Sequence, residues 1–444
     1  MFHSRYRLPG RTAENQNPEA TPDGGDYTSR DGRRRNFITM TNQERIQVRI
    51  ARDKARKAEK RKAQIKQHGT FTNVITMQAL LRSLQRRRKD VEWKGSVQSY
   101  IAHAPVKMKR AKDSLWAGRL DVNRKIKQMT ICERGKKRNI HAIMIDSRVI
   151  QGALCDSSIT PLTQPSLIYD NPASTKGKGV SHARRRIVRH IEDQVRQSGS
   201  DFYALVYDFS GFFDSISHSL CRRKLAEAGQ DEQLQALTMY FIKMYQEQDI
   251  SLITDKSEKE RLMEELRADR ACGATLGSQI SQDMALVVPN ELDHAIKDKA
   301  GIRHYIRYMD DGNILHADKD YLRRLLKSIK RLCAKLGLKL NEKKTRIVKA
   351  TRGFTFLKVR YTVTETGRII KRMAKSGIVR MRRKLKKFRK LVDAGLMTRD
   401  DAFNSFKSWF GNAKTIAHSY RTRKAMLILY NRLFNRYRTG GLIA

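Results

Sequence analysis

Acidic residues at the ends of short apolar segments are the feature that most constrains how this chain can fold. Residues 202–207 are strongly apolar and predict a strand that ends at Asp208. Far along the chain, residues 305–308 and 313–316 predict two more short strands. They flank Met-Asp-Asp-Gly at 309–312, which predicts a hairpin with Asp310 and Asp311 at its tip. The pattern favours a small sheet with acidic strand ends.

Carboxylates that converge from separate strands suit a pair of divalent cations. Magnesium prefers hard oxygen ligands and keeps waters and substrate phosphates in its shell, so a few carboxylates suffice. Two such ions about 3.5–4 Å apart can activate an attacking hydroxyl and stabilise a leaving group. A purely structural interpretation also exists, with Asp310 and Asp311 as a polar hairpin tip and Asp208 as a helix N-cap. The acidic motif taken alone is therefore weak evidence.

The charge balance predicts a polyanionic partner. The chain has 444 residues, with 92 Lys and Arg against 45 Asp and Glu, a formal net charge of +47. Such a surplus favours nucleic acid, because neutralising phosphates releases their counterions. The alternatives are a ribosomal-type protein or one that binds a membrane surface.

Cysteine use and hydropathy indicate where the protein works. The five cysteines form no Cys-x-x-Cys pair, so we expect reduced thiols and neither a zinc site nor redox chemistry. The first residues do not resemble a secretory signal, and no apolar run is long enough to span a membrane. We therefore expect a cytoplasmic protein with no membrane partner.

The chain also divides by composition. Residues 1 to about 40 are predicted to form a disordered tail, and residues 42–66 a basic, mostly solvated helix. From Phe71 the composition is globular, and Trp93 and Trp116 are predicted to anchor the core. Residues 126–145 predict two strands around a basic turn. Further helices are expected at 182–198, 218–249 and 257–269, from near Ser281, and at 319–336, where Gly337 ends the helix.

The C-terminal part predicts a basic helical domain. From Lys371 onward there are 20 Lys or Arg and three acids. Apolar residues recur at helical spacing between the basic ones, at Ile378, Met381, Leu385, Phe388 and Val392. One face of this domain should be packed in a core, and the other should suit phosphates.

These segments, taken in order, resemble the motifs of prokaryotic reverse transcriptases, the class of group II intron, retron and diversity-generating retroelement enzymes. The resemblance runs from about Phe71 to the C-terminus. In chain order it rests on Lys136-Lys137-Arg138 with residues 146–151, on 208–215, on 276–282, on 308–311, on Gly337-Leu338 with 341–345, and on 354–357. Six motifs in the family's order make chance a poor explanation.

The resemblance implies roles for particular residues. Asp208, Asp310 and Asp311 would be catalytic and would hold two Mg²⁺ ions, replaceable by Mn²⁺, with the backbone carbonyl of Phe209 as a further ligand. The primer grip would contain Phe356 and Leu357. The incoming nucleotide would be bound by Lys136, Arg138, Arg148, Phe213, Leu276, Gly277, Gln279 and Lys344.

Several of these residues have structural alternatives. Phe213, five residues after Asp208, matches the aromatic residue that leaves no room for a 2′-hydroxyl, although a core aromatic is the simpler interpretation. Lys136, Arg138, Arg148 and Lys344 could instead be solvated surface charges. The loop at 170–179 resembles a basic loop near the template, or is a solvated loop.

One difference from the family pattern indicates which subfamily the chain resembles. Many relatives have Gln-Gly-x-x-x-Ser-Pro where this chain has Leu276-Gly277-x-x-x-Ser281-Gln282. The aliphatic residue and the final Gln resemble diversity-generating retroelement enzymes, which copy RNA with frequent errors at adenines. Leu276 can pack against a nucleotide but cannot hydrogen-bond to it, which would loosen selection. Error-prone copying is therefore a hypothesis.

The sequence thus predicts an α+β right-hand polymerase. The expected parts are a basic N-terminal extension (1–70), fingers (71–200), a palm with a small antiparallel sheet (201–365) and a helical thumb (366–444). The expected function is RNA-directed DNA synthesis from an RNA template, a DNA or RNA primer and dNTPs, in a prokaryotic or phage-encoded system. Expected further partners are a small basic accessory protein or a dedicated noncoding RNA. The alternatives are a defence-associated or group II intron-like enzyme and a non-enzymatic RNA-binding maturase or scaffold.

Overall fold

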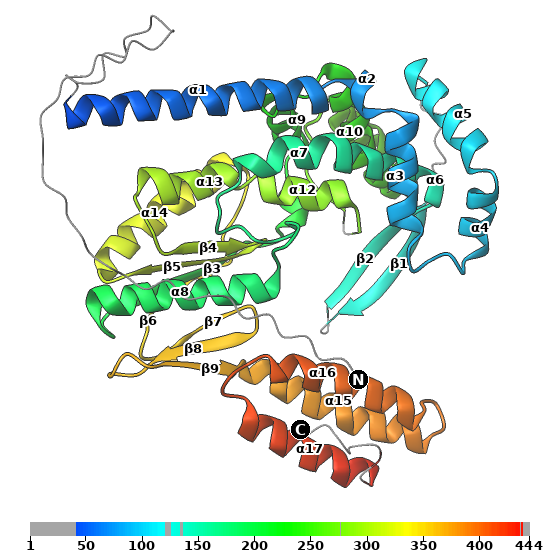
Figure 1. Ribbon diagram of the computed structural model, residues 1–444. Coiled ribbons are helices and arrows are strands. Elements are labelled where there is room, and N and C mark those ends of the chain that lie inside the picture. Colours follow the sequence, from blue (N-terminus) through cyan, green and yellow to red (C-terminus); the bar gives the residue numbers. More distant parts are fainter. Residues whose placement is uncertain (1–40, 120–125, 134–135, 276, 436, 438–444) are drawn as a thin grey trace, which may run out of the picture. The chain divides into compact units, whose positions relative to one another are not determined.

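The computed structural model describes residues 41–119, 126–133, 136–275, 277–435 and 437 (Figure 1). It divides into two compact units, residues 1–58 and 59–444. Within the described residues, no helix combines the length and apolar character that crossing a membrane requires.

The described part of the first unit is the beginning of α1 (Asn42–His68). Thr41 and Glu44 form a capping box there: the Thr41 hydroxyl accepts from the Glu44 amide, and the Glu44 carboxylate accepts from the Thr41 amide at 2.8 Å. No residue of α1 is buried, as expected for a helix with a thin apolar stripe.

The region that precedes the main sheet is mostly helical. It contains α2 (Phe71–Val74), α3 (Met77–Arg88), α4 (Gly95–Ala102), α5 (Ala104–Trp116), the antiparallel pair β1 (Ile126–Glu133) and β2 (Lys136–Ile143), α6 (Ile145–Leu154), η1 (Cys155–Ile159), α7 (Thr160–Thr163), η2 (Gln164–Ser166) and α8 (Val180–Ser198). Thr76 caps α3 by accepting a hydrogen bond from the Ala79 amide.

The main sheet is antiparallel throughout, with strand order β4-β5-β3-β6. Its strands are β3 (Tyr203–Asp208), β4 (Tyr305–Tyr308), β5 (Asp311–His316) and β6 (Arg346–Lys349). Between β3 and β4 lie η3 (Phe213–Ser215), α9 (His218–Glu227), α10 (Glu232–Ser251), α11 (Lys256–Arg267), α12 (Gln279–Val287), α13 (Asn290–His294) and η4 (Ala295–Lys299), and α14 (Lys319–Lys335) joins β5 to β6.

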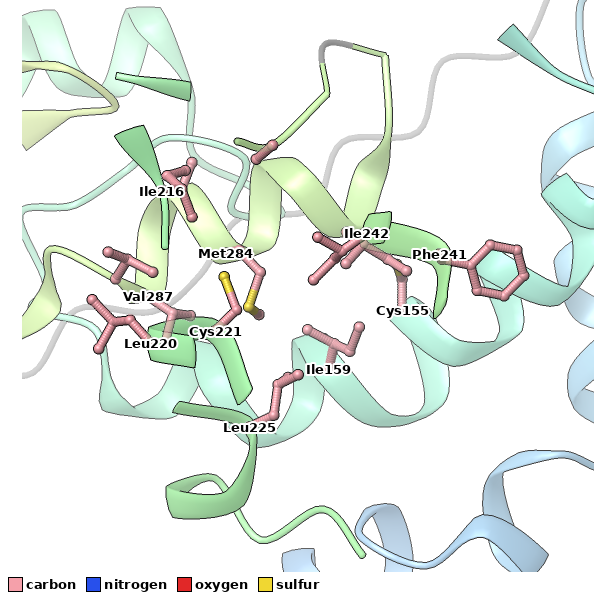
Figure 2. Packing of buried hydrophobic residues seen from close by; sticks show 14 of the residues in the cluster. Cys155, Ile159, Ile216, Leu220, Cys221, Leu225, Phe241, Ile242, Met284 and Val287 are labelled. Atoms are coloured by element: carbon pink, nitrogen blue, oxygen red, sulfur yellow. The ribbon is translucent and has the colours of Figure 1, made fainter. Parts of the chain in front are cut away.

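Both faces of this sheet are covered, because successive side chains along each strand point to opposite faces. Leu205 and Ile314 pack into the large cluster built with α9, α10, α12 and α14. Ala204, Ile306 and Leu315 pack on the other face against α8. Figure 2 shows the centre of the large cluster, where Met284 of α12 lies among side chains from η1, α9 and α10.

A second sheet and a helical domain complete the chain. The second sheet has strand order β7-β8-β9, from β7 (Phe354–Phe356), β8 (Val359–Val363) and β9 (Ile369–Met373), and it shares its core with α8. The helices α15 (Lys375–Asp393), α16 (Arg399–Lys414) and α17 (Tyr420–Phe434) enclose a separate cluster. Phe406 and Tyr430 stack at its centre, with ring centroids 4.6 Å apart.

The expected α+β class is confirmed, and most expected elements are present. Two details were wrong. Trp93 and Trp116 do not anchor the core, since they are 74% and 48% exposed. The acidic hairpin has only Met309 and Asp310 in its loop, because Asp311 and Gly312 already pair within the sheet. The helix expected from near Ser281 is present and begins at Gln279, where the Ser278 hydroxyl caps it by accepting from the Ser281 amide.

Candidate active site

The sheet register places Asp208 directly opposite Asp311. They are the last pair between β3 and β5, and such cross-strand neighbours have Cβ atoms about 4.5–5.5 Å apart. Tyr308 faces Asp311 across the hairpin, so Asp310 lies in the two-residue loop beside them. The Phe209 amide donates to the Asp310 carbonyl at 3.3 Å, which ties the end of β3 to this loop. Three acids distant in sequence thus lie at one end of the sheet.

A third segment closes the site from the other side of β3. The Asn341 amide donates to the Asp208 carbonyl at 2.7 Å, and the Ser210 amide donates to the Lys339 carbonyl at 2.8 Å. Phe209 forms an isolated antiparallel bridge with Leu340 between these contacts. The turn that follows places the Lys344 ammonium 2.8 Å from each carboxylate oxygen of Asp208.

The electrostatics of the site follow from this crowding. Burial, which is the largest cause, and the negative charges of Asp310 and Asp208 together raise the pKa of Asp311 to about 7. Burial would lower the pKa of Lys344, but its hydrogen bond to Asp208 and the surrounding carboxylates raise it instead. The site therefore concentrates negative charge that the protein itself offsets with one ammonium group.

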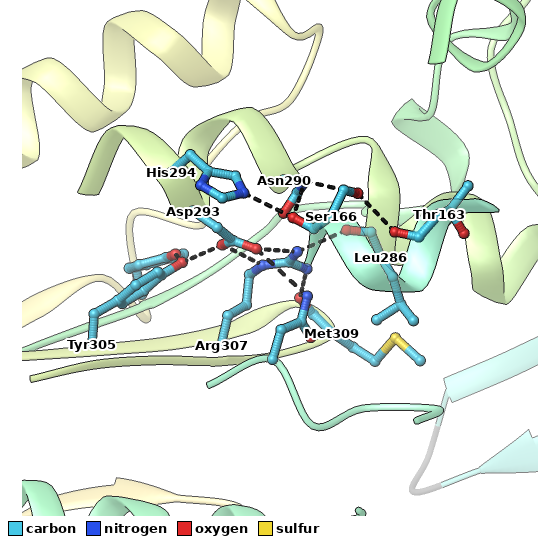
Figure 3. A network of polar contacts seen from close by, with 11 residues as sticks. Thr163, Ser166, Leu286, Asn290, Asp293, His294, Tyr305, Arg307 and Met309 are labelled. Atoms are coloured by element: carbon cyan, nitrogen blue, oxygen red, sulfur yellow. Dashed lines mark hydrogen bonds and ion pairs between the residues drawn. The ribbon is translucent and has the colours of Figure 1, made fainter. Parts of the chain in front are cut away.

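A buried ion pair supports the acidic hairpin from beneath (Figure 3). The Arg307 guanidinium donates to both carboxylate oxygens of Asp293, at 2.7 and 2.6 Å, and neither side chain is exposed. Arg307 also donates to the Leu286 carbonyl on α12 and, at 3.0 Å, to the Met309 carbonyl in the hairpin loop. One side chain thus joins the loop that carries Asp310 to α12 and α13.

Two tyrosines extend this network into the sheet. The Tyr305 hydroxyl donates to Asp293 at 2.6 Å, so Tyr207 is the donor in the 2.7 Å contact between the two hydroxyls. The Tyr207 ring lies where a side chain at position 312 would be, since a Cβ on Gly312 would come within 2.1 Å of it. Only glycine therefore fits immediately after the acidic pair.

The hairpin loop itself is strained. Met309 has a φ of 55°, and it occupies the first central position of a turn in which Asp310 has no positive φ. This is the pattern of a type II′ turn, which usually has glycine at that position. A non-glycine residue there costs on the order of 1–3 kcal/mol, and the Arg307 bond to Met309 helps to hold it.

The aromatic residues after Asp208 form a packed group. The rings of Phe209 and Phe212 stack at 5.0 Å, and Phe213 meets Phe212 edge to face at 5.6 Å. Phe209 and Phe212 are buried, whereas Phe213 is only partly buried. Among these three rings, Phe213 is the one with a surface left for a ligand.

The segment before α12 packs against β2. Gly277 has a φ of 106°, and a Cβ there would lie 3.3 Å from the His141 carbonyl and the Ile140 side chain. Glycine thus permits a close approach between this segment and the strand that carries Lys136 and Arg138. Leu276 and the side chains of Lys136 and Arg138 lie outside the described residues.

Two other predicted nucleotide-binding residues have defined surroundings. The side-chain amide oxygen of Gln279 accepts a hydrogen bond from Arg87 at 2.5 Å, and Arg87 also pairs with Asp156 at 3.0 Å. Arg148, on α6, is exposed, and among the described residues no carboxylate pairs with it.

The donor set fits divalent cations. Carboxylates and a backbone carbonyl are hard oxygen donors, and the Lys344 ammonium on Asp208 marks a position that favours positive charge. The side chains do not already form a metal cage: among the described residues, no three or more His, Cys, Asp or Glu side chains are grouped as metal ligands. Asp208, Asp310, Asp311 and the Phe209 carbonyl remain the residues that would hold the ions.

Residues 124–361, just over half of the chain, match the family described as reverse transcriptase (RNA-dependent DNA polymerase). The chain belongs to the reverse transcriptase family. Members of this family are RNA-directed DNA polymerases, which are nucleotidyltransferases, and they generally use divalent metal ions.

Two solved structures are similar to this reverse transcriptase family member. One is telomerase from Candida albicans in complex with a TWJ fragment of telomeric RNA, at 13% identity and TM-score 0.38, covering 69% of this chain and 55% of that one. The other is apo telomerase from Candida tropicalis truncated from its C-terminal domain, at 13% identity and TM-score 0.39, covering 55% of this chain and 54% of that one. The chain thus spans about half the length of these structures. No curated protein sequence matches it.

The predicted primer-grip residues of this reverse transcriptase family member lie at the β7–β8 turn. Phe356 is buried in the cluster shared with α8, and Leu357 is the first of two turn residues. Leu357 and Lys358 have φ values of 46° and 68°, the pattern of a type I′ turn without the usual Asn or Gly. The Arg184 guanidinium donates to the Leu357 carbonyl at 2.9 Å and so holds this turn against α8.

The residues that support the acidic site from neighbouring helices and strands were not predicted from the sequence. Arg307 and Asp293 form the buried pair beneath the hairpin, and Arg87 binds Gln279 from a distant helix. Arg307 does give one signal, because it is a charged residue inside an apolar strand segment next to the acidic motif. Asp293 and Arg87 give none, since their sequences are ordinary helix sequences.

Proposed function

We propose that this chain is an RNA-directed DNA polymerase that extends a primer on an RNA template. The proposal rests chiefly on the Asp208–Asp311 pairing with Asp310 in the adjoining loop. In the reaction, the primer 3′-oxygen forms a bond to the α-phosphorus of a dNTP. The bond from that phosphorus to the bridging oxygen breaks, pyrophosphate leaves, and the hydroxyl proton passes to solvent.

Asp208, Asp310, Asp311 and the Phe209 carbonyl would hold two Mg²⁺ ions, for which Mn²⁺ can substitute. When bound, such ions lower the pKa of the hydroxyl and offset charge on the leaving group. The protein's own contribution is to keep three carboxylates together despite their repulsion. The register of β3 and β5 and the Arg307 support of the loop supply that arrangement.

Cationic residues around the site suit a triphosphate. Lys344 carries its charge beside Asp208 and would turn to the pyrophosphate as it forms. Arg148 is exposed and has no carboxylate partner among the described residues, and Lys136 and Arg138 are on β2, the strand against which Gly277 packs. We assign these four side chains to the phosphates of the incoming nucleotide, and Leu276, Gly277 and Gln279 to its base and sugar.

Phe213 would select deoxynucleotides. Its ring is partly exposed at the edge of the aromatic group that follows Asp208, and a flat aromatic face next to the sugar would exclude a 2′-hydroxyl. Replacing it with alanine should raise the relative use of ribonucleotides at least tenfold in single-nucleotide incorporation, with dNTP incorporation reduced less. An unchanged preference would remove Phe213 from this role.

The family is broad, and we propose the branch that resembles diversity-generating retroelement enzymes. The support is the aliphatic Leu276 and the Gln282 that ends the same motif. The proposal predicts raised misincorporation opposite template adenines, and uniformly accurate copying would exclude it. A nearby template and variable repeat pair in the genome would fit diversification, whereas a toxin-like partner or adjacent noncoding RNA would fit defence.

The decisive experiment is primer extension on an RNA template. The wild-type protein should incorporate dNTPs with Mg²⁺, and Asp310→Asn should reduce the rate at least a thousandfold while nucleic-acid binding persists. Asp320→Asn, on the exposed start of α14, is the matched control and should leave extension unchanged. Equal binding with no extension by the wild-type protein would favour the maturase or scaffold alternative.

A further inference from the structure

A pocket of about 610 Å³ lies outside the acidic site, where α8 meets the second sheet. Its walls are α8, strands β8 and β9, and the residues just after α16. Val359, Tyr361 and Ile416 form a buried floor, and Tyr169 is on its rim with 60% of its surface exposed. The primer-grip turn adjoins it, because Arg184 in its wall binds the Leu357 carbonyl.

The pocket is strongly basic. Arg184, Arg185, Arg186, Arg189 and Lys371 line it, against one acid, Glu192. Arg186 is neutralised by Asp170 at 2.7 Å. Within the part of the chain that the structure describes, no ion pair involves Arg185, Arg189 or Lys371.

The spacing of the exposed residues Arg185 and Arg189 suits an anion whose charges repeat along a chain. Arg185 and Arg189 are four residues apart on α8, so they share one face, with Cβ atoms about 5–6 Å apart. Like charges at this spacing destabilise a helix. Glu192 lies in the same pocket, but among the described residues no carboxylate forms an ion pair with either arginine. A chain of phosphates would relieve this repulsion, because consecutive phosphates along one strand recur at a comparable spacing.

Polar groups in the wall also lack partners. Among the described residues, Nε2 of His182 and Nε of Arg184 are buried and have no hydrogen-bond partner. Burial lowers the pKa of His182, and the charges of Lys178, Arg185 and Arg186 lower it further. The wall therefore combines a positive potential with buried nitrogens that its own residues leave unsatisfied.

We propose that this pocket binds the phosphodiester backbone of a nucleic-acid strand through Arg185, Arg189 and Lys371. The site is distinct from the acidic centre, and only the identity of the strand rests on the proposed function. Its place beside the primer-grip turn fits a strand that has passed the acidic centre or is about to reach it. Binding there would add affinity without taking part in bond formation.

The test compares two charge reversals of equal size. Arg185→Glu with Arg189→Glu alters the pocket, and Lys327→Glu with Arg331→Glu alters two exposed residues at the same spacing on α14. Each full-length variant is titrated into a fluorescein-labelled RNA strand, DNA strand or RNA–DNA duplex at several salt concentrations. Anisotropy gives the affinity and its salt dependence, and circular dichroism checks the fold.

We expect the pocket variant to bind at least tenfold more weakly than the wild-type protein, and the α14 variant to differ less than threefold. For a single strand, two lost phosphate contacts should lower the salt slope by about 1.4. Arg185→Lys with Arg189→Lys should retain most of the affinity. Equal losses in both reversals would mean diffuse attraction and would overturn the proposal, as would an unchanged salt slope.

Extension assays separate this proposal from the proposed function. At saturating primer–template the pocket variant should keep the wild-type rate, while its KM for primer–template rises tenfold or more. Asp310→Asn should show the reverse, with normal binding and no extension. If the wild-type protein does not extend primers but the pocket variant still loses binding, the pocket proposal stands and the polymerase proposal falls.

Discussion

Lys344 lies 2.8 Å from both carboxylate oxygens of Asp208, so the ammonium occupies the oxygens that a metal ion would use. A divalent cation bound at Asp208 as proposed would therefore have to compete with Lys344 or displace it. The same side chain is in a position to offset charge on pyrophosphate once it moves. Competition with the metal ion would lower activity, whereas stabilisation of pyrophosphate would raise it, so experiment can separate the two roles.

Replacing Lys344 with alanine should lower the extension rate at saturating Mg²⁺ by about a hundredfold, because charge stabilisation of the leaving group is lost. The Mg²⁺ concentration for half-maximal rate should fall, because the competing ammonium is gone. Lys343→Ala, its exposed neighbour, is the control and should change neither quantity. A higher Mg²⁺ requirement in Lys344→Ala would contradict the competition argument.

Arg307 connects the hairpin loop to the helices beneath it, so its replacement should affect catalysis as well as stability. Arg307→Lys keeps a buried positive charge but cannot make the bonds to Asp293, Leu286 and Met309 together. We expect the extension rate to fall at least tenfold, with a smaller change in KM for dNTP. The measurement is single-turnover extension well below the melting temperature.

Tyr305→Phe provides the comparison for that experiment. It removes the hydrogen bond to the buried Asp293 carboxylate and the acceptor of the Tyr207 hydroxyl, and it leaves the Arg307 bond to Met309 in place. The loss should cost about 1.5–3 kcal/mol of unfolding free energy, with little change in extension rate. If the two variants lose activity in proportion to their stability, Arg307 has no positioning role.

The sequence predicted the sheet around Asp208 well because its signals are local. The apolar strand segments, the hairpin between two of them and the acids at the strand ends can all be recognised within a few residues, although the sequence did not place Asp311 and Gly312 in the sheet. The register that pairs Asp208 with Asp311 has a local cause as well, because Gly312 must lie opposite Tyr207. A shift of one residue would move every side chain of the strand to the other face of the sheet.

The contacts that support the site could not be predicted in the same way. Arg87 binds Gln279 across 192 positions, and Arg184 binds Leu357 across 173. No periodicity encodes such pairs, since each depends on how separate helices pack. The prediction for Trp93 and Trp116 was wrong because residue type alone does not determine burial: Trp93 lies in the turn between α3 and α4, and Trp116 is the last residue of α5.

Asp283 on α12 should make stability depend on pH. It is buried beside Cys155, Asp156 and Arg87, and burial is the main reason that its pKa is raised to about 7. Below the ordinary pKa, near 4, the carboxyl is protonated in both folded and unfolded chains and has no effect. As pH rises from 4 to 7, the unfolded chain loses this proton first, so stability falls by up to about 4 kcal/mol.

Asp283→Asn should remove that dependence. The variant should melt at nearly the wild-type temperature at pH 4.5 and several degrees higher at pH 8, as measured by thermal unfolding with circular dichroism. Asp298→Asn changes an exposed carboxyl of the neighbouring region and should not raise the melting temperature at either pH. An equal gain at both pH values would point to better packing and not to the proton.

The β7–β8 turn, which carries the proposed primer-grip residues, gives the last prediction, because its strain and its support can be changed separately. Leu357 and Lys358 both have positive φ, and Arg184 holds the turn by its bond to the Leu357 carbonyl. Arg184→Ala should therefore let the turn relax and raise the KM for primer–template several-fold, with a smaller effect on the rate at saturation. Lys358→Gly relieves the positive φ at the second turn position, where glycine is favoured. Combined with Arg184→Ala, it should restore most of the KM in steady-state extension, whereas failure to restore it would show that Arg184 acts on the primer directly and not through the turn.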